Sequence, residues 1–105
     1  MGVGMQIVYL GFCGTSQLEA EAASQLVRLD RYSALIPNCH LAIEAVRSQA
    51  GSLTYDVRLD LVTPEHDLWP IGHCANVNAE EAVRRAFDAA EKRLCAVANI
   101  DRLKH

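Results

Sequence analysis

The most regular pattern in the chain is an alternation of apolar and polar residues over positions 53–62, LTYDVRLDLV. A period of two places successive side chains on opposite faces of a strand, so this segment predicts a strand with one buried and one solvent-exposed face. The residues expected on the buried face are Leu53, Tyr55, Val57, Leu59 and Leu61, and those expected on the exposed face are Thr54, Asp56, Arg58 and Asp60.

Three further segments have weaker strand patterns. Residues 5–12 are rich in β-forming side chains, residues 39–47 alternate, and residues 67–75 are the least regular of the three. Pro70 lies inside the last segment. Because proline has no N–H to donate to a neighbouring strand, we expect residues 67–75 to form an edge strand.

Two segments repeat their apolar residues at helical spacing. The first begins with Ser16-x-x-Glu19, a capping box, and we expect it to run to about Tyr32 and to end before Pro37. The second begins after Asn78, a residue type that is typical of a helix N-cap. The apolar residues that we expect this second helix to bury are Val83, Phe87, Ala90, Leu94 and Val97.

The order of these elements, β-α-β-β-β-α, predicts an α+β fold of two layers, with a four-stranded, mostly antiparallel sheet and both helices packed on its one apolar face. A chain of 105 residues is long enough for one such core and too short for two. We expect the domain to span residues 5–98, with residues 1–4 as an N-terminal extension and residues 99–105 as a C-terminal tail.

The formal net charge of −3 argues against indiscriminate nucleic-acid binding but is compatible with a local basic patch. The N-terminal segment resembles neither a secretory signal nor a membrane span, so we expect a cytoplasmic protein. The four cysteines contain no C-x-x-C pair, and we expect free thiols that are buried as small apolar side chains. They are Cys13, Cys39, Cys74 and Cys95.

No motif for catalysis or metal binding emerges. Each of the pairs Cys39-His40 and His73-Cys74 can offer only one ligand to a given face of a strand, so we expect no metal site. The chain has no nucleophile elbow and no phosphate-binding loop. We therefore expect a protein that is not an enzyme, with no cofactor and no small-molecule substrate.

The last predicted helix carries four cations within AVRRAFDAAEKRL, residues 82–94. At about 100° per residue, Arg84 lies between Asp88 and Glu91, which predicts a surface ion pair. The other three cations border a strip of alanines that would let a flat polyanion approach closely. These cations are Arg85, Lys92 and Arg93, and the alanines are Ala82, Ala89 and Ala96.

On the first predicted helix, Arg28 and Arg31 share an outward face, within about 60° of each other. If the two helices lie side by side, these two residues and the three outer cations of the second helix form one basic surface. Phosphate contacts from such a surface position a protein on RNA without reading its sequence. The alternative is a set of ordinary solvated charges, which are common on helix exteriors.

Three stretches of the chain resemble the ribosome hibernation promoting factor and ribosome-associated inhibitor family, also called S30EA or sigma-54 modulation proteins. LVRLDRYSALIPNCHLAIEA, residues 26–45, is similar to the family's end of helix one, loop and second strand. AGSLTYDVRLDLVTP, residues 50–64, is similar to its third strand, and NVNAEEAVRRAFDAAEKRL, residues 76–94, to its last helix. The likeness extends from about residue 5 to residue 98.

This resemblance implies a βαβββα fold and a protein that binds the small ribosomal subunit, in the channel used by mRNA and tRNA, during stress or stationary phase. It implies contacts to the rRNA backbone from basic residues on the two helices, with Arg58 as a weaker candidate on the exposed sheet face. The helix residues at the matching positions are Arg28, Arg31, Arg85, Lys92 and Arg93.

The chain also departs from the family pattern. Its second helix has four carboxylates among the cations, and Trp69-Pro70 does not match the family's usual pattern. Ending after that helix, it would be a short form without a C-terminal dimerisation domain. The alternative function is a diverged protein-interaction module, with Trp69 as an anchor if its ring is exposed, or a homodimer formed through the exposed sheet face. A partly buried Trp69 that closes one end of the core is the simpler structural expectation.

Overall fold

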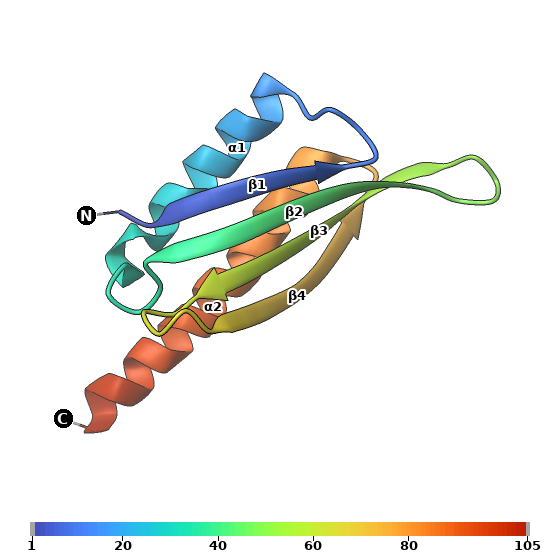
Figure 1. Cartoon of the computed structure of the whole chain (residues 1–105). Helices are drawn as coiled ribbons and strands as arrows, with labels where there is room; N and C mark the ends of the chain where they lie inside the picture. The colour runs from blue at the N-terminus through green and yellow to red at the C-terminus, as the bar shows by residue number, and fades with distance from the viewer. Residues whose placement is uncertain (1, 105) are drawn as a thin grey trace.

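The computed structural model describes the backbone of residues 2–104 and the side chains of residues 2–99. Both helices lie behind a single sheet with the strand order β1-β2-β3-β4 (Figure 1). The predicted two-layer α+β fold is therefore confirmed. Its elements are β1 (Gly4–Leu10), α1 (Ser16–Leu26), the 3₁₀ helix η1 (Val27–Tyr32), β2 (Asn38–Arg47), β3 (Leu53–Val62), β4 (Leu68–Asn76) and α2 (Ala79–Lys104).

The sheet is mixed because β1 pairs in parallel with β2, whereas the β2–β3 and β3–β4 pairs are antiparallel. Strands β1, β2 and β4 consequently run in one direction, and the helices that follow β1 and β4 return in the opposite direction. The two helices therefore lie parallel on the same face of the sheet, with their N-termini at the same end (Figure 1).

The helix starts are fixed by side-chain caps. Thr15 caps α1, because its Oγ1 accepts a hydrogen bond of 3.0 Å from the Leu18 N–H. The capping box predicted at Ser16 is therefore wrong by one residue, which places Glu19 outside the capping position. The predicted cap of α2 is confirmed: Asn78 Oδ1 accepts from the Glu81 N–H at 3.0 Å.

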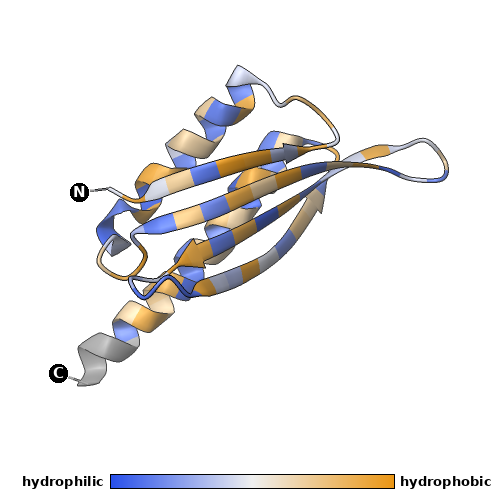
Figure 2. Ribbon diagram, viewed as in Figure 1, coloured by the Kyte–Doolittle hydropathy of each residue, from blue (hydrophilic) through white to orange (hydrophobic). Residues whose placement is uncertain are grey.

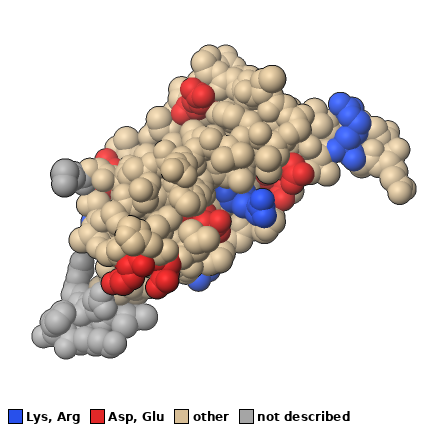
Figure 3. Space-filling model, viewed as in Figure 1, with Lys and Arg blue, Asp and Glu red and all other residues tan. Residues whose placement is uncertain are grey.

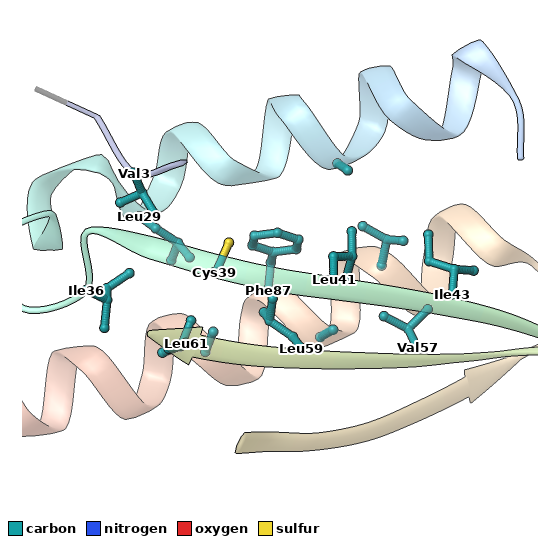
Figure 4. Close-up of a cluster of buried hydrophobic side chains, with 14 of the residues drawn as sticks. Val3, Leu29, Ile36, Cys39, Leu41, Ile43, Val57, Leu59, Leu61 and Phe87 are labelled. Atoms are coloured by element: carbon teal, nitrogen blue, oxygen red, sulfur yellow. The ribbon is translucent and has the colours of Figure 1, made fainter. Parts of the chain in front are cut away.

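The core lies between the sheet and the helices, and the alternation along the strands places it there. Bands of hydrophobic and hydrophilic residues alternate along the two central strands, β2 and β3, in Figure 2. The Phe87 ring of α2 lies among Cys39, Leu41 and Leu59 of the two central strands (Figure 4). The largest side chains with less than 2% exposure include Phe87, Leu29, Ile36, Leu41, Ile43, Leu59, Leu61, Leu94, Val57 and Val83.

Strand β4 is an edge strand, as Pro70 predicts. Its pairing with β3 shifts between Leu59 and Asp60, which face Gly72 and Pro70 respectively. This shift inserts one extra residue, Ile71, into β4. Gly72 has a φ of 118°, a conformation that favours glycine, and so accommodates the bulge.

The ordered fold reaches beyond both boundaries expected from the sequence. Val3 is only 7% exposed, and its N–H donates to Asp30 Oδ1 at 3.2 Å. At the other end, α2 continues past residue 98 to Lys104. Neither described helix is long and apolar enough to cross a membrane.

The four cysteines are free thiols, as expected, but they are not all buried. Cys39 is fully buried, Cys74 is half-buried, and Cys13 and Cys95 are exposed. The expectation of four buried thiols is therefore wrong for the two exposed residues. Cys13 lies in the loop before α1, and Cys95 lies on the outer side of α2, so neither points into the core.

Candidate nucleic-acid interface

A groove of about 320 Å³ runs between the two helices on the outside of the helix layer. Because α1 and α2 lie parallel, residues of η1 meet the middle of α2 across this groove. The side chains that line it combine three cations with two carboxylates and a thiol. They are Arg28, Arg31, Asp88, Glu91, Lys92 and Cys95.

Arg28 is the residue that joins the two helices. Its Nη1 lies 2.7 Å from Asp88 Oδ1, and its Nε donates to Glu91 Oε1 at 3.1 Å. Nη1 also donates to Gln25 Oε1 at 2.6 Å. The hydrogen bonds to Glu91 and then to Asp88 raise the pKa of Arg28 above its ordinary value, so its charge is satisfied within the protein.

Arg31 is held more loosely at the end of the same groove. Its Nη2 lies 3.6 Å from Glu91 Oε2 and donates to the Tyr32 hydroxyl at 2.5 Å. The Arg31 side chain is 65% exposed, compared with 35% for Arg28. An incoming anion can therefore reach Arg31 with less rearrangement than Arg28 requires.

Arg84 forms the predicted kind of ion pair, but with different partners. It lies 2.9 Å from Glu81 of α2 and 3.4 Å from Glu21 of α1. The sequence pattern assigned it to Asp88 and Glu91, and that assignment is wrong. The physical reason is the position of α1, which brings Arg28 against these two carboxylates and leaves Glu21 opposite Arg84.

The three outer cations of α2 differ in their surroundings. Arg85 is 59% exposed and lies 3.4 Å from Glu81. The Arg93 guanidinium lies over the Trp69 ring, 5.4 Å from its centroid. Within the part of the chain whose side chains are described, neither Lys92 nor Arg93 forms an ion pair.

These cations do not form one continuous basic surface. Arg28, Arg31 and Lys92 surround the groove, where Asp88 and Glu91 neutralise much of their charge. Arg93 lies toward β4. Arg85 also lies near β4, because its charge acts to lower the pKa of Cys74 there, although burial has the larger effect and raises that pKa. Arg85 and Arg93 therefore lie on the β4 side of α2, away from α1.

The predicted strip of open alanines is also interrupted. Ala82 is fully buried, Ala89 is half-buried and Ala96 is exposed. The buried arc of α2 is broader than its apolar stripe suggests because the helix packs over both β3 and β4. A polyanion therefore meets a surface that is open only toward the C-terminal part of this strip.

The opposite face of the sheet carries scattered charges of both signs: Glu44 of β2 and Asp56, Arg58 and Asp60 of β3. Figure 3, viewed from this side, shows a surface that is largely neither acidic nor basic. Arg58 is exposed there and faces Ala42 and His73 on the neighbouring strands. It lies on the opposite side of the sheet from the helix cations and cannot share one surface with them.

The structure separates the two cysteine–histidine pairs. Cys39 is buried while His40 is exposed, and Cys74 is half-buried while His73 is exposed, so each pair spans the two faces. Strand β3 lies between the pairs. Among the described residues, no group of three or more His, Cys, Asp or Glu side chains is arranged to hold a metal ion.

Trp69 is partly buried and packs against the core, with Arg93 over its ring. Partial burial is the simpler structural expectation for Trp69, and its use as an anchor for a partner protein stays a prediction. The sequence did not identify Gln25 and Tyr32 as hydrogen-bond partners of Arg28 and Arg31, or Cys95 as part of the groove. Gln25 could have been found from its i, i+3 spacing to Arg28, and Cys95 from its i, i+4 spacing to Glu91.

Comparison with known proteins supports the fold but gives no information on the surface side chains of this chain. No protein-family model matches the sequence, and no curated protein matches it significantly. A ribosomal subunit interface protein from Coxiella burnetii superposes with a TM-score of 0.75 at 14% identity, covering 92% of this chain and 99% of the other. The N-terminal domain of Thermus thermophilus Protein Y superposes with a TM-score of 0.63 at 16% identity, covering 90% and 96%.

Both of these structures belong to the family that the sequence resembles. At identities this low, the likeness is one of fold. The strand order, the parallel β1–β2 pair and the two parallel helices are the features that carry it. The chain therefore has the βαβββα fold of the ribosome hibernation promoting factor family, as its sequence resemblance implies.

Proposed function

We propose that the protein is a ribosome-associated hibernation factor that binds the backbone of rRNA on the small ribosomal subunit and inhibits translation under stress or in stationary phase. Its fold, shared with a ribosomal subunit interface protein, supports this function. The observation that carries it is the set of exposed cations on the helix layer. These are Arg31, Arg85, Lys92 and Arg93.

The ion pairs suggest how such a surface would bind. Lys92 and Arg93 form no ion pair with a described carboxylate, and Arg31 and Arg85 have partners at 3.4–3.6 Å, so these four residues make the first phosphate contacts. Arg28 reaches a phosphate only by exchanging Asp88 or Glu91 for it. Four contacts give a slope of about −3 in the logarithm of the binding constant against the logarithm of salt concentration.

This function needs no chemistry at the site. We propose that the protein is not an enzyme and binds no cofactor, because phosphate neutralisation by side chains is sufficient for occupancy of the rRNA channel. The proposal places the protein in the cytoplasm, where ribosomes are. It also assigns the acidic side chains of the groove a role in keeping binding weak.

The test is co-sedimentation of the purified protein with small subunits on sucrose gradients, at low and near-physiological salt. We expect co-migration that weakens steeply with salt. Replacement of Arg85, Lys92 and Arg93 by Glu should abolish it without unfolding the domain, since all three side chains are exposed. Unchanged association of this variant would contradict the proposal.

Two double variants with the same change in total charge distinguish the effect of the binding site on ribosome association from the effect of net charge. Lys92→Glu with Arg93→Glu changes the total charge by the same amount as Arg47→Glu with Arg58→Glu. The first pair lies on the helix layer, and the second lies on β2 and β3. We expect the first to lose ribosome binding and the second to retain most of it. Equal losses would mean that only the total charge matters.

The alternative is a protein-interaction module that keeps the fold without ribosome binding. The neutralisation of Arg28 by Asp88 and Glu91 favours this alternative, because it removes a cation from the surface that RNA would contact. Absence of co-migration at both salt concentrations would favour this alternative over rRNA binding.

A further inference from the structure

The two edges of the sheet are protected to very different degrees. Strand β4 has Pro70, an inserted residue and a glycine with positive φ, all of which interrupt an edge that could pair with another strand. Strand β1 has none of these features. Its pairing with β2 is regular from Gly4 to Leu10, and its sequence, GMQIVYL, contains no charge and no proline.

The backbone of β1 offers a row of free hydrogen-bonding groups. The Gly4 N–H donates to the Pro37 carbonyl at 3.0 Å, which fixes the phase of the parallel ladder. Alternate residues of a strand direct their N–H and C=O to the same side. Met5, Ile7 and Tyr9 therefore direct these groups away from β2, and within residues 2–104 no other strand lies on that side.

The side chains next to this edge are apolar and incompletely covered. Val8 is 51% exposed and Leu10 is 37% exposed on the open face of the sheet. On the helix side, Met5, Ile7 and Tyr9 are only half-buried, whereas their counterparts in β2 and β3 are almost completely buried. An additional strand beside β1 would cover both sets.

We propose that β1 pairs with β1 of a second copy of this chain, antiparallel and across a two-fold axis, so that two four-stranded sheets become one sheet of eight strands. Full overlap of Gly4–Leu10 places the axis at Ile7. Ile7 then exchanges both backbone hydrogen bonds with Ile7 of the other copy, and Val8 lies beside Gln6 of that copy. This inference goes beyond the proposed function and does not depend on it.

The absence of charge on β1 favours a second copy of the same strand as the occupant. Each chain carries a net charge of −3, which opposes contact between two copies where their charged side chains would meet. Strand β1 has no charged side chain and therefore can meet itself without a like-charge pair. The same absence of cations on β1 removes the attraction that a nucleic acid would need at this edge.

The test is the oligomeric state by sedimentation equilibrium over a range of protein concentrations, comparing Val8→Asp with Val46→Asp. Both valines are exposed on the open face, at 51% and 41%, but Val46 lies at the far end of β2. We expect a concentration-dependent dimer whose dissociation constant rises at least about tenfold in Val8→Asp and changes little in Val46→Asp. A monomer at every concentration, or equal weakening by both variants, would overturn the proposal.

Amide hydrogen exchange gives a second readout that does not rely on a variant. In a monomer, the Ile7 and Tyr9 amides face solvent and exchange quickly at any concentration. In the proposed dimer, their protection rises with protein concentration, while the Val8 amide, which faces β2, is protected throughout. Fast exchange of Ile7 and Tyr9 under conditions where the dimer is populated would contradict pairing through β1.

Discussion

Helix α2 is held in place by two contacts of opposite character, one with the sheet and one with α1. Its contact with the sheet is dry: Val83, Phe87 and Leu94 are fully buried against β3 and its neighbours. Its surface contact with α1 and with η1, which follows α1, is charged: Arg84 lies 3.4 Å from Glu21 of α1, and Arg28 of η1 lies between Asp88 and Glu91. The same helix therefore presents an apolar stripe to the sheet and an ion-pair network to its neighbouring helix.

The two contacts differ in what they can do. Apolar burial is insensitive to salt and loses free energy when a side chain is truncated, so it fixes where the helix lies. A partly exposed ion pair contributes little net stability and is screened by salt, because its partners are already solvated. The charged contact can therefore rearrange at little cost in stability while the dry contact keeps the helix in place.

The largest expected effect breaks the dry contact. Phe87→Ala removes the largest fully buried side chain and leaves a cavity, so we expect the free energy of unfolding to fall by about 3–5 kcal/mol. Urea unfolding followed by circular dichroism measures it. The control is Val77→Ala, because Val77 is 73% exposed; we expect a change within about 0.5 kcal/mol. A loss below about 1 kcal/mol in Phe87→Ala would show that the sheet contact is not the main anchor.

A smaller effect tests how dry this contact is. Burial raises the pKa of the Cys39 thiol from 9.0 to about 12. The unfolded chain releases this proton near pH 9, while the folded chain retains it. The buried thiol therefore contributes its full stabilisation of the folded state below pH 9, and this stabilisation decreases as the pH rises toward 12. We expect the free energy of unfolding to fall by about 1.4 kcal/mol per pH unit in this window from this group alone.

The comparison of wild type with Cys39→Ala isolates the contribution of the Cys39 thiol to the pH dependence of stability, because all other groups titrate in both proteins. The variant starts less stable at neutral pH because it loses buried atoms, and the difference between the two proteins should shrink above pH 9. A constant difference up to pH 11 would mean that water reaches this thiol. Rapid reaction of Cys39 with a thiol reagent, alongside the exposed Cys13 and Cys95, would lead to the same conclusion.

The smallest effect concerns the charged contact. Arg28→Met keeps the aliphatic stem and removes the ion pairs with Asp88 and Glu91, so we expect a loss of about 1 kcal/mol at low salt that diminishes at high salt. Lys92→Met is the matched control, because Lys92 has no ion pair with a described carboxylate, and we expect it to change stability by less than about 0.5 kcal/mol. A salt-independent loss in Arg28→Met would mean that Arg28 acts through packing.

The sequence predicted the fold because the patterns that specify it are local. The alternation of LTYDVRLDLV and the helical spacing around Phe87 predict their elements without reference to the rest of the chain, and Pro70 correctly indicates an edge strand. The error at Ser16 has an equally local cause. Two adjacent hydroxyl residues can both cap a helix, and the backbone adopts its extended conformation at Thr15.

The candidate site was predicted less well because it depends on which helices meet. Asp88 and Glu91 are correctly spaced to pair with Arg84, but the parallel docking of α1 places Arg28 within 2.7 Å of Asp88 instead. No pattern within α2 contains that information. Binding of rRNA by the five cations stays a prediction. The structure narrows which of them are available: Arg28 is paired with Asp88 and Glu91, whereas Arg31 and Lys92 line the groove with more exposed side chains.

The parallel pairing of β1 with β2 also matters while the chain is being made. Of the four described strands, β1 leaves the ribosome first, and its partner β2 begins at Asn38, which is 38 − 10 = 28 residues after Leu10. The nascent chain therefore passes through a stage in which an uncharged apolar strand has two unpaired edges. That stage ends only when β2 has been synthesised, which gives the rate of translation over residues 11–47 a direct influence on how much of the chain escapes aggregation.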